Sequence, residues 1–195
     1  KLVLATDIAE SALTIEGVRV VVDAGLARVP QADPSGLRTR LVTGRASQAS
    51  VEQRRGRAGR TGPGACYRLW QAPETRGLPP RIEPEILSGD LTGLVLSLAD
   101  WGESDPLNLN WIDPPPAGRI KAARRRLRAL GALDAGDAIN ARGREMAALP
   151  LSPQLAALVV AGDTAQARAL GAHIAAILTE RGMGGASVDL NDRLS

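Results

Sequence analysis

Two apolar, β-branched runs lie near the start of the chain, LVLAT at residues 2–6 and VRVVVDAG at residues 18–25. Runs that are apolar at nearly every position, rather than at alternate ones, are typical of parallel strands buried on both faces. The polar segment between them, DIAESALTIEG, predicts a loop or a short helical turn that ends at Gly17. This part of the chain is therefore predicted to adopt an α/β fold with a parallel sheet.

Turn, strand and helix signals continue this pattern. The turn signal ADPSG at residues 32–36 lies between two strand-like runs and predicts a β-hairpin. The segment SQASVEQRRGRAGR predicts a helix that begins near Ser47, and GACYRLW at residues 64–70 predicts another short strand. A proline-rich linker follows at residues 71–83, and from about residue 84 the leucine and alanine spacing becomes helical. The first of these helical runs, EILSGDLTGLVLSLADWG, is predicted to stop at Gly102.

The composition excludes several classes of protein. The single cysteine, Cys66, cannot form an internal disulfide or a cysteine-cluster metal site, and we expect it to be a small buried residue. No run approaches the roughly 20 apolar residues that a membrane span needs, and the N-terminus has no signal segment. We therefore expect a reducing, cytoplasmic compartment and no membrane partner.

Basic residues are unevenly distributed along the chain. Lysine occurs only at Lys1 and Lys121, so 22 of the 24 basic residues are arginine. They cluster in QRRGRAGR at residues 53–60 and in GRIKAARRRLR at residues 118–128. A codon preference for arginine would explain the total but not the clustering. Arginine offers a flat fork of donors that suits phosphate oxygens.

The first cluster has a definite helical geometry. At about 100° per residue, Gln53 lies at 0°, Arg57 at about 40° and Arg60 at about −20°, so the three share one face. Gly56 and Gly59 leave the backbone bare beside them, which allows a ligand to approach closely. An amide and two guanidinium groups suit a polyphosphate. An arginine aimed at a transferring phosphoryl group stabilises the transition state, typically by ~10³-fold or more in rate.

Other interpretations compete with this one. The first cluster could be a solvated basic helix or a nonspecific nucleic-acid face. SVEQ at residues 50–53 also fits a capping box that would tie Gln53 to the helix start, although Ser47 as the cap leaves a full turn before Gln53. The second cluster could contact nucleic acid by charge alone, but a solvated, packed helix is favoured. Trp101 and Trp111 could stack on bases, but their apolar neighbours favour core packing.

At this point two motifs carry a resemblance to a known family. QRRGRAGR resembles motif VI of superfamily 2 helicases, and LATDIAESALTIEGVRVVVDAG at residues 4–25 resembles motif V of the DEAH-box group. Farther along, DPLNLNWIDPPP resembles the winged-helix region of DEAH-box helicases, and GREMAALPLSPQLAALVVAG resembles the bacterial HrpB branch most closely. The resemblance covers the chain from residue 1 to about residue 181.

The resemblance implies the C-terminal half of the motor core of an ATP-dependent DEAH-box helicase. It implies that residues 1–70 are the latter part of a second RecA-like domain, with a β-hairpin in a partial parallel sheet. Residues 71–83 would be a linker, residues 84–149 a mostly helical winged-helix-like domain, and residues 150–195 the start of a helical, ratchet-like bundle.

The resemblance also assigns roles to residues that face the nucleotide. In the family, the glutamine and the last two arginines of motif VI contact the nucleotide phosphates, which are Gln53, Arg57 and Arg60 here, with the two arginines in the catalytic role. From motif V, Thr14 and Glu16 would face the ATP side. Without the resemblance, these two residues fit ordinary turn and cap chemistry.

A second set of motif V residues would face nucleic acid. By position, Thr6 and Asp7 would lie against the phosphodiester backbone of a single strand. The family usually has asparagine at Asp7, and a carboxylate repels phosphate, although it could accept a hydrogen bond from a ribose hydroxyl. Ala12 also replaces a usual hydroxyl residue, and Arg55 replaces a usual alanine.

Some parts of such a motor are missing from the sequence. A P-loop needs a lysine followed by serine or threonine, and neither lysine has that context. The acidic metal-holding motif is also missing, and His173 is expected to be an ordinary helix residue. ATP with Mg²⁺ is the expected cofactor, with its sites mostly on an N-terminal RecA-like domain, so this segment is expected to be inactive alone.

The expected partners are that N-terminal domain and single-stranded RNA or DNA, contacted through its backbone by a monomer. Two rival functions remain. The chain could be a non-catalytic basic module that binds nucleic acid, in which the arginines supply only salt-dependent affinity. It could instead be a structural domain that binds a helicase partner.

Overall fold

The computed structural model describes residues 2–11, 16–32, 39–180, 182–185 and 187–194. The chain divides into two compact units. The first unit comprises Lys1–Gln31 and Arg40–Glu83, and the second comprises Ala32–Thr39 and Pro84–Ser195. In the described part of the chain, every helix is too short or too polar to cross a membrane.

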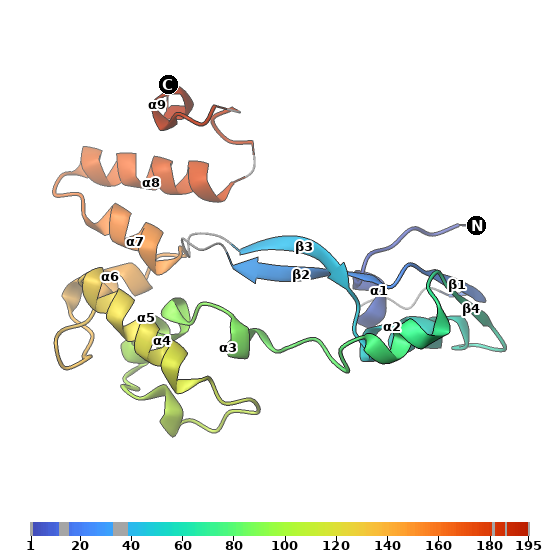
Figure 1. Ribbon diagram of the computed structural model, residues 1–195. Coiled ribbons are helices and arrows are strands. Elements are labelled where there is room, and N and C mark those ends of the chain that lie inside the picture. Colours follow the sequence, from blue (N-terminus) through green and yellow to red (C-terminus); the bar gives the residue numbers. More distant parts are fainter. Residues whose placement is uncertain (1, 12–15, 33–38, 181, 186, 195) are drawn as a thin grey trace. The chain divides into compact units, whose positions relative to one another are not determined.

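A two-stranded parallel sheet forms the centre of the first unit. Strand β1 (Val20–Asp23) pairs with β4 (Ala65–Arg68), and Val20 lies opposite Ala65. Helix α2 (Gln48–Ala58) packs against both strands, and α1 (Ile8–Ser11) packs against α2 (Figure 1). The prediction of a parallel sheet is confirmed, although β1 pairs with β4 and not with residues 2–6.

The sheet is nevertheless open on one face. Val20 is 56% exposed, Val22 is 63% exposed and Tyr67 is 60% exposed. These side chains alternate with less exposed ones along β1 and β4, because successive side chains point to opposite faces of a sheet. The prediction that residues 18–25 are buried on both faces is therefore wrong, since helix α2 covers one face only.

Residues 2–6 do not form the predicted strand. Leu2 is 86% exposed and Leu4 is 90% exposed. A strand exists through hydrogen bonds to a neighbour, and the two described sheets pair β1 with β4 and β2 with β3. The composition of this run is suited to a strand, but no described strand lies beside it.

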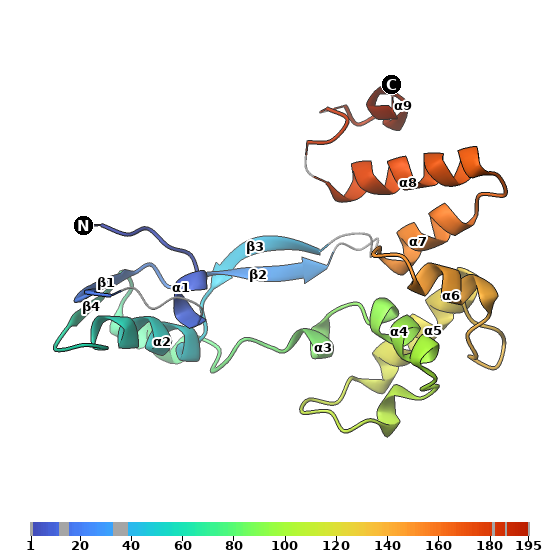
Figure 2. The same ribbon diagram turned by 180° about the vertical axis from the view of Figure 1, so that it is seen from behind.

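The predicted β-hairpin is present as a second two-stranded sheet. Strands β2 (Leu26–Ala32) and β3 (Thr39–Arg45) pair with each other and run in opposite directions (Figures 1 and 2). The turn between them lies outside the described residues.

A small apolar core fixes α2 in the first unit. Val51 is fully buried and packs with Ala27, Ala46 and Leu78. Leu78 follows the 3₁₀-helix η1 (Ala72–Gly77), and its carbonyl accepts a hydrogen bond of 2.8 Å from the Gln48 side chain. Part of the proline-rich segment therefore folds back onto the start of α2.

The second unit is helical and has a larger core. Its helices are α3 (Glu85–Ser88), α4 (Thr92–Trp101), η2 (Pro106–Asn108), α5 (Ala117–Ala129), α6 (Ala141–Ala147), α7 (Pro153–Val160), α8 (Ala165–Thr179) and α9 (Leu190–Leu194). Leu127 and Met146 are among its most deeply buried side chains. Helix α4 ends at Gly102, as predicted, because this glycine adopts a φ of 101° that other residues rarely adopt. Helices α7 and α8 lie side by side (Figure 2).

Candidate functional site

Helix α2 begins where the sequence indicates. Ser47 caps it, and the Ser47 hydroxyl accepts a hydrogen bond of 3.1 Å from the backbone N–H of Ser50. Ser50 itself lies inside the helix, so the alternative capping box that would tie Gln53 to the helix start is wrong. The side chain of Gln53 is thereby left for other contacts.

The buried side of α2 determines which side is open. Gln53 follows Val51 by two positions, or about 200° of helical rotation. Because Val51 is fully buried, Gln53 lies on the opposite side and is exposed. Arg57 lies next to Gln53 on this side and is half-buried, with its guanidinium donating to the backbone carbonyl of Glu10.

Arg60 differs from the sequence-based geometry. The helix ends at Ala58 with Gly59 as its C-cap, so Arg60 lies beyond the helix rather than on its stripe. The Arg60 side chain is exposed. The placement of all three residues on one helix is therefore wrong for Arg60, and their joint contact with a ligand stays a prediction.

The glycines of this segment are not required by its packing. A Cβ added at Gly56 or at Gly59 would meet nothing within 4 Å, and neither residue has a positive φ. Glycine inside a helix costs about 1 kcal/mol relative to alanine. The molecule thus keeps a bare stretch of backbone at Gly56 and Gly59 that its own packing does not use.

Arg54 has a role in the structure that its sequence position did not reveal. Its Nε lies 2.7 Å from Glu10 Oε1, and its Nη1 lies 3.1 Å from Asp23 Oδ1 and 2.8 Å from the Leu26 carbonyl. Burial lowers the pKa of Arg54, but the hydrogen bonds and charges of Glu10 and Asp23 outweigh burial and raise the pKa above its ordinary value. Arg54 therefore stays charged and ties α2 to α1 and to the end of β1.

The sequence held a partial signal for this role. Arg54 lies about 100° from Gln53 on the helix and about 60° from the buried Val51, so partial burial follows from the same geometry. A partly buried arginine needs a carboxylate partner. The helix geometry does not say which carboxylate, because Glu10 and Asp23 are 44 and 31 residues away along the chain.

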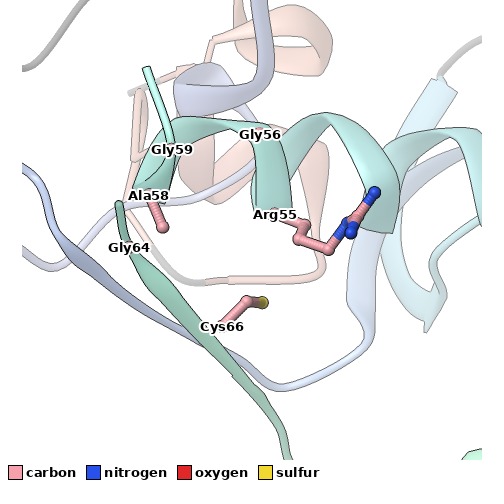
Figure 3. A pocket seen from close by; sticks show the side chains of 6 residues that line it. All are labelled: Arg55, Gly56, Ala58, Gly59, Gly64 and Cys66. Atoms are coloured by element: carbon pink, nitrogen blue, oxygen red, sulfur yellow. The ribbon is translucent and has the colours of Figure 1, made fainter. Parts of the chain in front are cut away.

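A shallow cavity of about 420 Å³ lies between α2 and β4 (Figure 3). It is lined by Arg55, Gly56, Ala58, Gly59, Gly64 and Cys66. Gly64 is essential to the close approach of these elements, since a Cβ there would lie 2.0 Å from the Ala58 carbonyl oxygen. Cys66 is half-buried rather than fully buried, and burial raises the pKa of its thiol.

This cavity does not include Gln53, Arg57 or Arg60. The two glycines form one of its walls, so the bare backbone faces open space. Beside the cavity, the hydrogen bond from Arg68 lowers the pKa of Glu52, burial opposes it, and the charge of Arg55 adds to the lowering. Glu52 pairs with both arginines on the exposed surface of α2.

The motif V residues predicted to face nucleic acid precede α1 in the sequence, and those predicted to face ATP follow it. Thr6 is exposed, and Asp7 is half-buried in the turn that leads into α1. The backbone carbonyl of Asp7 accepts a hydrogen bond of 2.8 Å from the Glu10 N–H. Glu16 is exposed in a turn, and Thr14 lies outside the described residues. Their roles stay predictions.

Most arginines of the second cluster, on α5, have partners in their own unit. Arg124 lies 3.2 Å from Asp105, Arg126 lies 2.5 Å from Asp90, and Arg128 lies 3.2 Å from Asp137. The apolar side of α5, including Leu127, is buried in the helical core. These contacts favour the packed, solvated helix over a nucleic-acid contact.

The tryptophans of the second unit differ in burial. Trp111 is half-buried and donates a hydrogen bond of 2.7 Å to the Pro106 carbonyl. Trp101 is 75% exposed, so the prediction of core packing is wrong for it. It ends α4, where the chain turns at Gly102 toward solvent. As for metals, no group of three or more ligating side chains is found among the described residues.

Comparison with known proteins places these features in a family. Residues 1–62 match the helicase conserved C-terminal domain. The chain is 48% identical over 180 residues to the ATP-dependent RNA helicase HrpB of Escherichia coli, and 44% identical over 162 residues to the pre-mRNA-splicing factor ATP-dependent RNA helicase prp22 of Schizosaccharomyces pombe. These alignments cover 92% and 82% of this chain.

Solved structures agree with the sequence comparison. The crystal structure of the Escherichia coli DEAH/RHA helicase HrpB superimposes with a TM-score of 0.84 and 46% identity, over 94% of this chain and 23% of that one. This chain spans 22% of the length of HrpB and 14% of the length of prp22. Its first 62 residues belong to the helicase conserved C-terminal domain family, and the chain resembles the segment of DEAH/RHA helicases that carries this domain.

Proposed function

We propose that this chain is part of the motor of an ATP-dependent helicase, and that its open α2 segment holds the phosphates of ATP. One observation carries the proposal. Gly56 and Gly59 expose backbone that the packing does not need, in the same segment as the exposed side chains of Gln53 and Arg60. Glycine at these positions would allow a charged ligand to approach the backbone closely, because it has no side chain in the way. The similarity to ATP-dependent RNA helicases supports the same reading.

In this proposal each residue has a distinct task. The Gln53 amide donates to a phosphate oxygen, and Arg57 and Arg60 provide positive charge for the oxygens of the transferring group. A guanidinium has five N–H donors, so Arg57 can keep its bond to Glu10 and still reach a phosphate. Thr14 and Glu16 would complete the ATP-facing side. When bound, ATP and Mg²⁺ supply the phosphoryl group and the charge that polarises it.

The nucleic-acid side of the proposal involves the segment before α1. Thr6 and Asp7 would contact the backbone of a single strand of RNA or DNA, without reading its bases. The remaining phosphate and metal contacts would come from an N-terminal RecA-like domain. We further propose that residues 1–70 belong to the second RecA-like domain, that residues 84–149 form a winged-helix-like domain and residues 150–195 start a helical ratchet-like bundle, in a monomer.

The test is the Arg60→Ala substitution in the full-length protein that carries this sequence. We expect ATPase activity to fall by about 10³-fold, the magnitude typical of an arginine that stabilises phosphoryl transfer, while affinity for single-stranded RNA is largely kept. The matched control is Arg55→Ala, which removes an exposed arginine of α2, five residues before Arg60, that pairs with surface Glu52. It should retain activity.

A non-catalytic module that binds nucleic acid is the second candidate, and the basic cluster on α2 is the observation in its favour. It predicts that Arg60→Ala weakens binding of RNA and makes its salt dependence shallower by about 0.7 in the log–log slope. It also predicts that the wild-type protein has no ATPase activity. Either result contradicts the proposed phosphate contact.

A further inference from the structure

A buried ion pair links α1 to α2 in the first unit, apart from the residues proposed to touch phosphate. The Arg54 side chain is 15% exposed, the Glu10 side chain 13% and the Asp23 side chain 1%. Arg54 Nη2 lies 2.5 Å from Glu10 Oε1, and Nε approaches the same oxygen. Two carboxylates thus share one guanidinium inside the unit.

Holding two helices together with buried charges is unfavourable, because the charges lose their hydration. Buried ion pairs often stabilise a fold no better than apolar residues of similar size. Among the described residues, the buried Asp23 Oδ2 also has no hydrogen-bond partner, and an unsatisfied buried oxygen is unfavourable. Apolar packing would therefore hold α1 to α2 at lower cost, so the charges require an explanation beyond attachment.

Glu10 connects the two proposed contact regions through three separate polar groups. Its backbone N–H donates to the Asp7 carbonyl at 2.8 Å, and its backbone carbonyl accepts from Arg57. Its carboxylate accepts from Arg54, which adjoins Gln53 on α2. Hydrogen bonds through Glu10 therefore connect the Asp7 segment, proposed to face the nucleic-acid strand, with helix α2, proposed to face phosphate.

We propose that Arg54 and Glu10 are positioning residues that couple strand binding at residues 6–7 to the phosphate-facing side of α2. The inference rests on the proposed function, and it assigns to this pair a role in communication rather than in contact with either ligand. When the Asp7 segment is displaced, Glu10 moves with it. The contacts of Glu10 with Arg54 and Arg57 then transmit this displacement to α2. Such contiguous polar contacts are a physical route for coupling two sites, and the route needs a direct test.

The planar shape of arginine is part of the argument. Arg54 donates to Glu10 through Nε, and to Asp23 and the Leu26 carbonyl through Nη1. A lysine ammonium is a single point charge and cannot span these partners in the same way. Arg54→Lys therefore keeps the charge and loses the connection, while Glu10→Gln keeps an acceptor oxygen and loses the charge.

The experiment measures the ATPase kcat of the full-length protein, with and without single-stranded RNA. For Arg54→Lys and for Glu10→Gln, we expect the RNA-stimulated rate to fall by about tenfold, within the range typical of coupling between sites, and the basal rate to stay within about twofold. The double variant should be no worse than either single variant, because both break one connection. Arg55→Lys, at an α2 arginine whose side chain is 64% exposed, should leave both rates unchanged.

The ratio of the two rates separates coupling from folding. A purely structural pair would lower the basal and stimulated rates by the same factor, or would leave both unchanged, and either result overturns the inference. If Arg60→Ala abolishes ATPase activity while Arg54→Lys and Glu10→Gln keep the wild-type stimulation ratio, only the inference fails. If the wild-type protein has no ATPase activity, the proposed function fails and the inference fails with it.

Discussion

The two arginine clusters look alike in the sequence and differ in the structure. On α5, Arg124, Arg126 and Arg128 each pair with an aspartate of the same unit, at exposed or half-exposed positions. The arginines of the first cluster differ from one another in burial and in their partners. Arg54 is buried between two carboxylates, Arg57 is half-buried against Glu10, and Arg60 is exposed beyond the helix end.

This difference teaches that arginine density does not identify a binding site. The α5 charges are balanced by nearby acids, and the apolar side of that helix packs in a core. The α2 segment instead combines an exposed amide, an exposed arginine and two glycines that its packing does not need. What separates the candidate ligand site from the solvated helix is therefore the set of partners of each guanidinium.

The largest effect should come from removing a buried guanidinium. Arg54→Met leaves Glu10 and Asp23 as uncompensated buried carboxylates, which should lower the free energy of opening α2 by about 3–5 kcal/mol. Arg126→Met removes an arginine whose side chain is 41% exposed, so the opening of α5 should change by less than about 1 kcal/mol. Native-state hydrogen exchange of the amides in each helix measures both. Equal effects would erase the contrast between the clusters.

A smaller effect, of opposite sign, should come from filling the bare backbone. Gly56→Ala should stabilise α2 by about 0.5–1 kcal/mol, because it removes a helix-interior glycine without creating a contact. The same change should lower ATPase activity if a ligand approaches this backbone. Thermal unfolding and ATPase assays of the same variant give the two readings.

The control for that change lies on the other helix. Gly118 of α5 also has open space around an added Cβ, so Gly118→Ala should leave ATPase activity unchanged. Full activity in Gly56→Ala would remove the reason for treating the α2 glycines as part of a site.

The smallest expected effect concerns the exposed pairs of Glu52. Its pKa is lowered in the folded protein, so its ionised form contributes stability above its ordinary pKa. That contribution is lost as the pH falls through the ordinary value toward the lowered one. Glu52→Gln should therefore be slightly less stable than the wild type at neutral pH and equal to it in acid, a difference of less than about 1 kcal/mol because the pair is exposed. A thermal unfolding series across this pH range checks the sign.

Local signals in the sequence were reliable where the physics is local. Ser47 capped α2, and Gly102 ended α4, because a cap and a left-handed turn depend on a few neighbouring residues. The exposed position of Gln53 also followed from helical spacing. The predicted strand at residues 2–6 failed because a strand needs a partner, and propensity alone does not supply one.

The sequence by itself determined the start of α2 at Ser47, the hairpin strands, the presence of a parallel sheet and the resemblance of motifs V and VI. Only the tertiary structure decided which arginine is buried against carboxylates and which is exposed to solvent. It brought Glu10 and Asp23 to Arg54 across 44 and 31 residues and left Arg60 in solvent. The physical reason is that helical angles follow from neighbouring residues, whereas the partner of a buried charge depends on where distant segments meet.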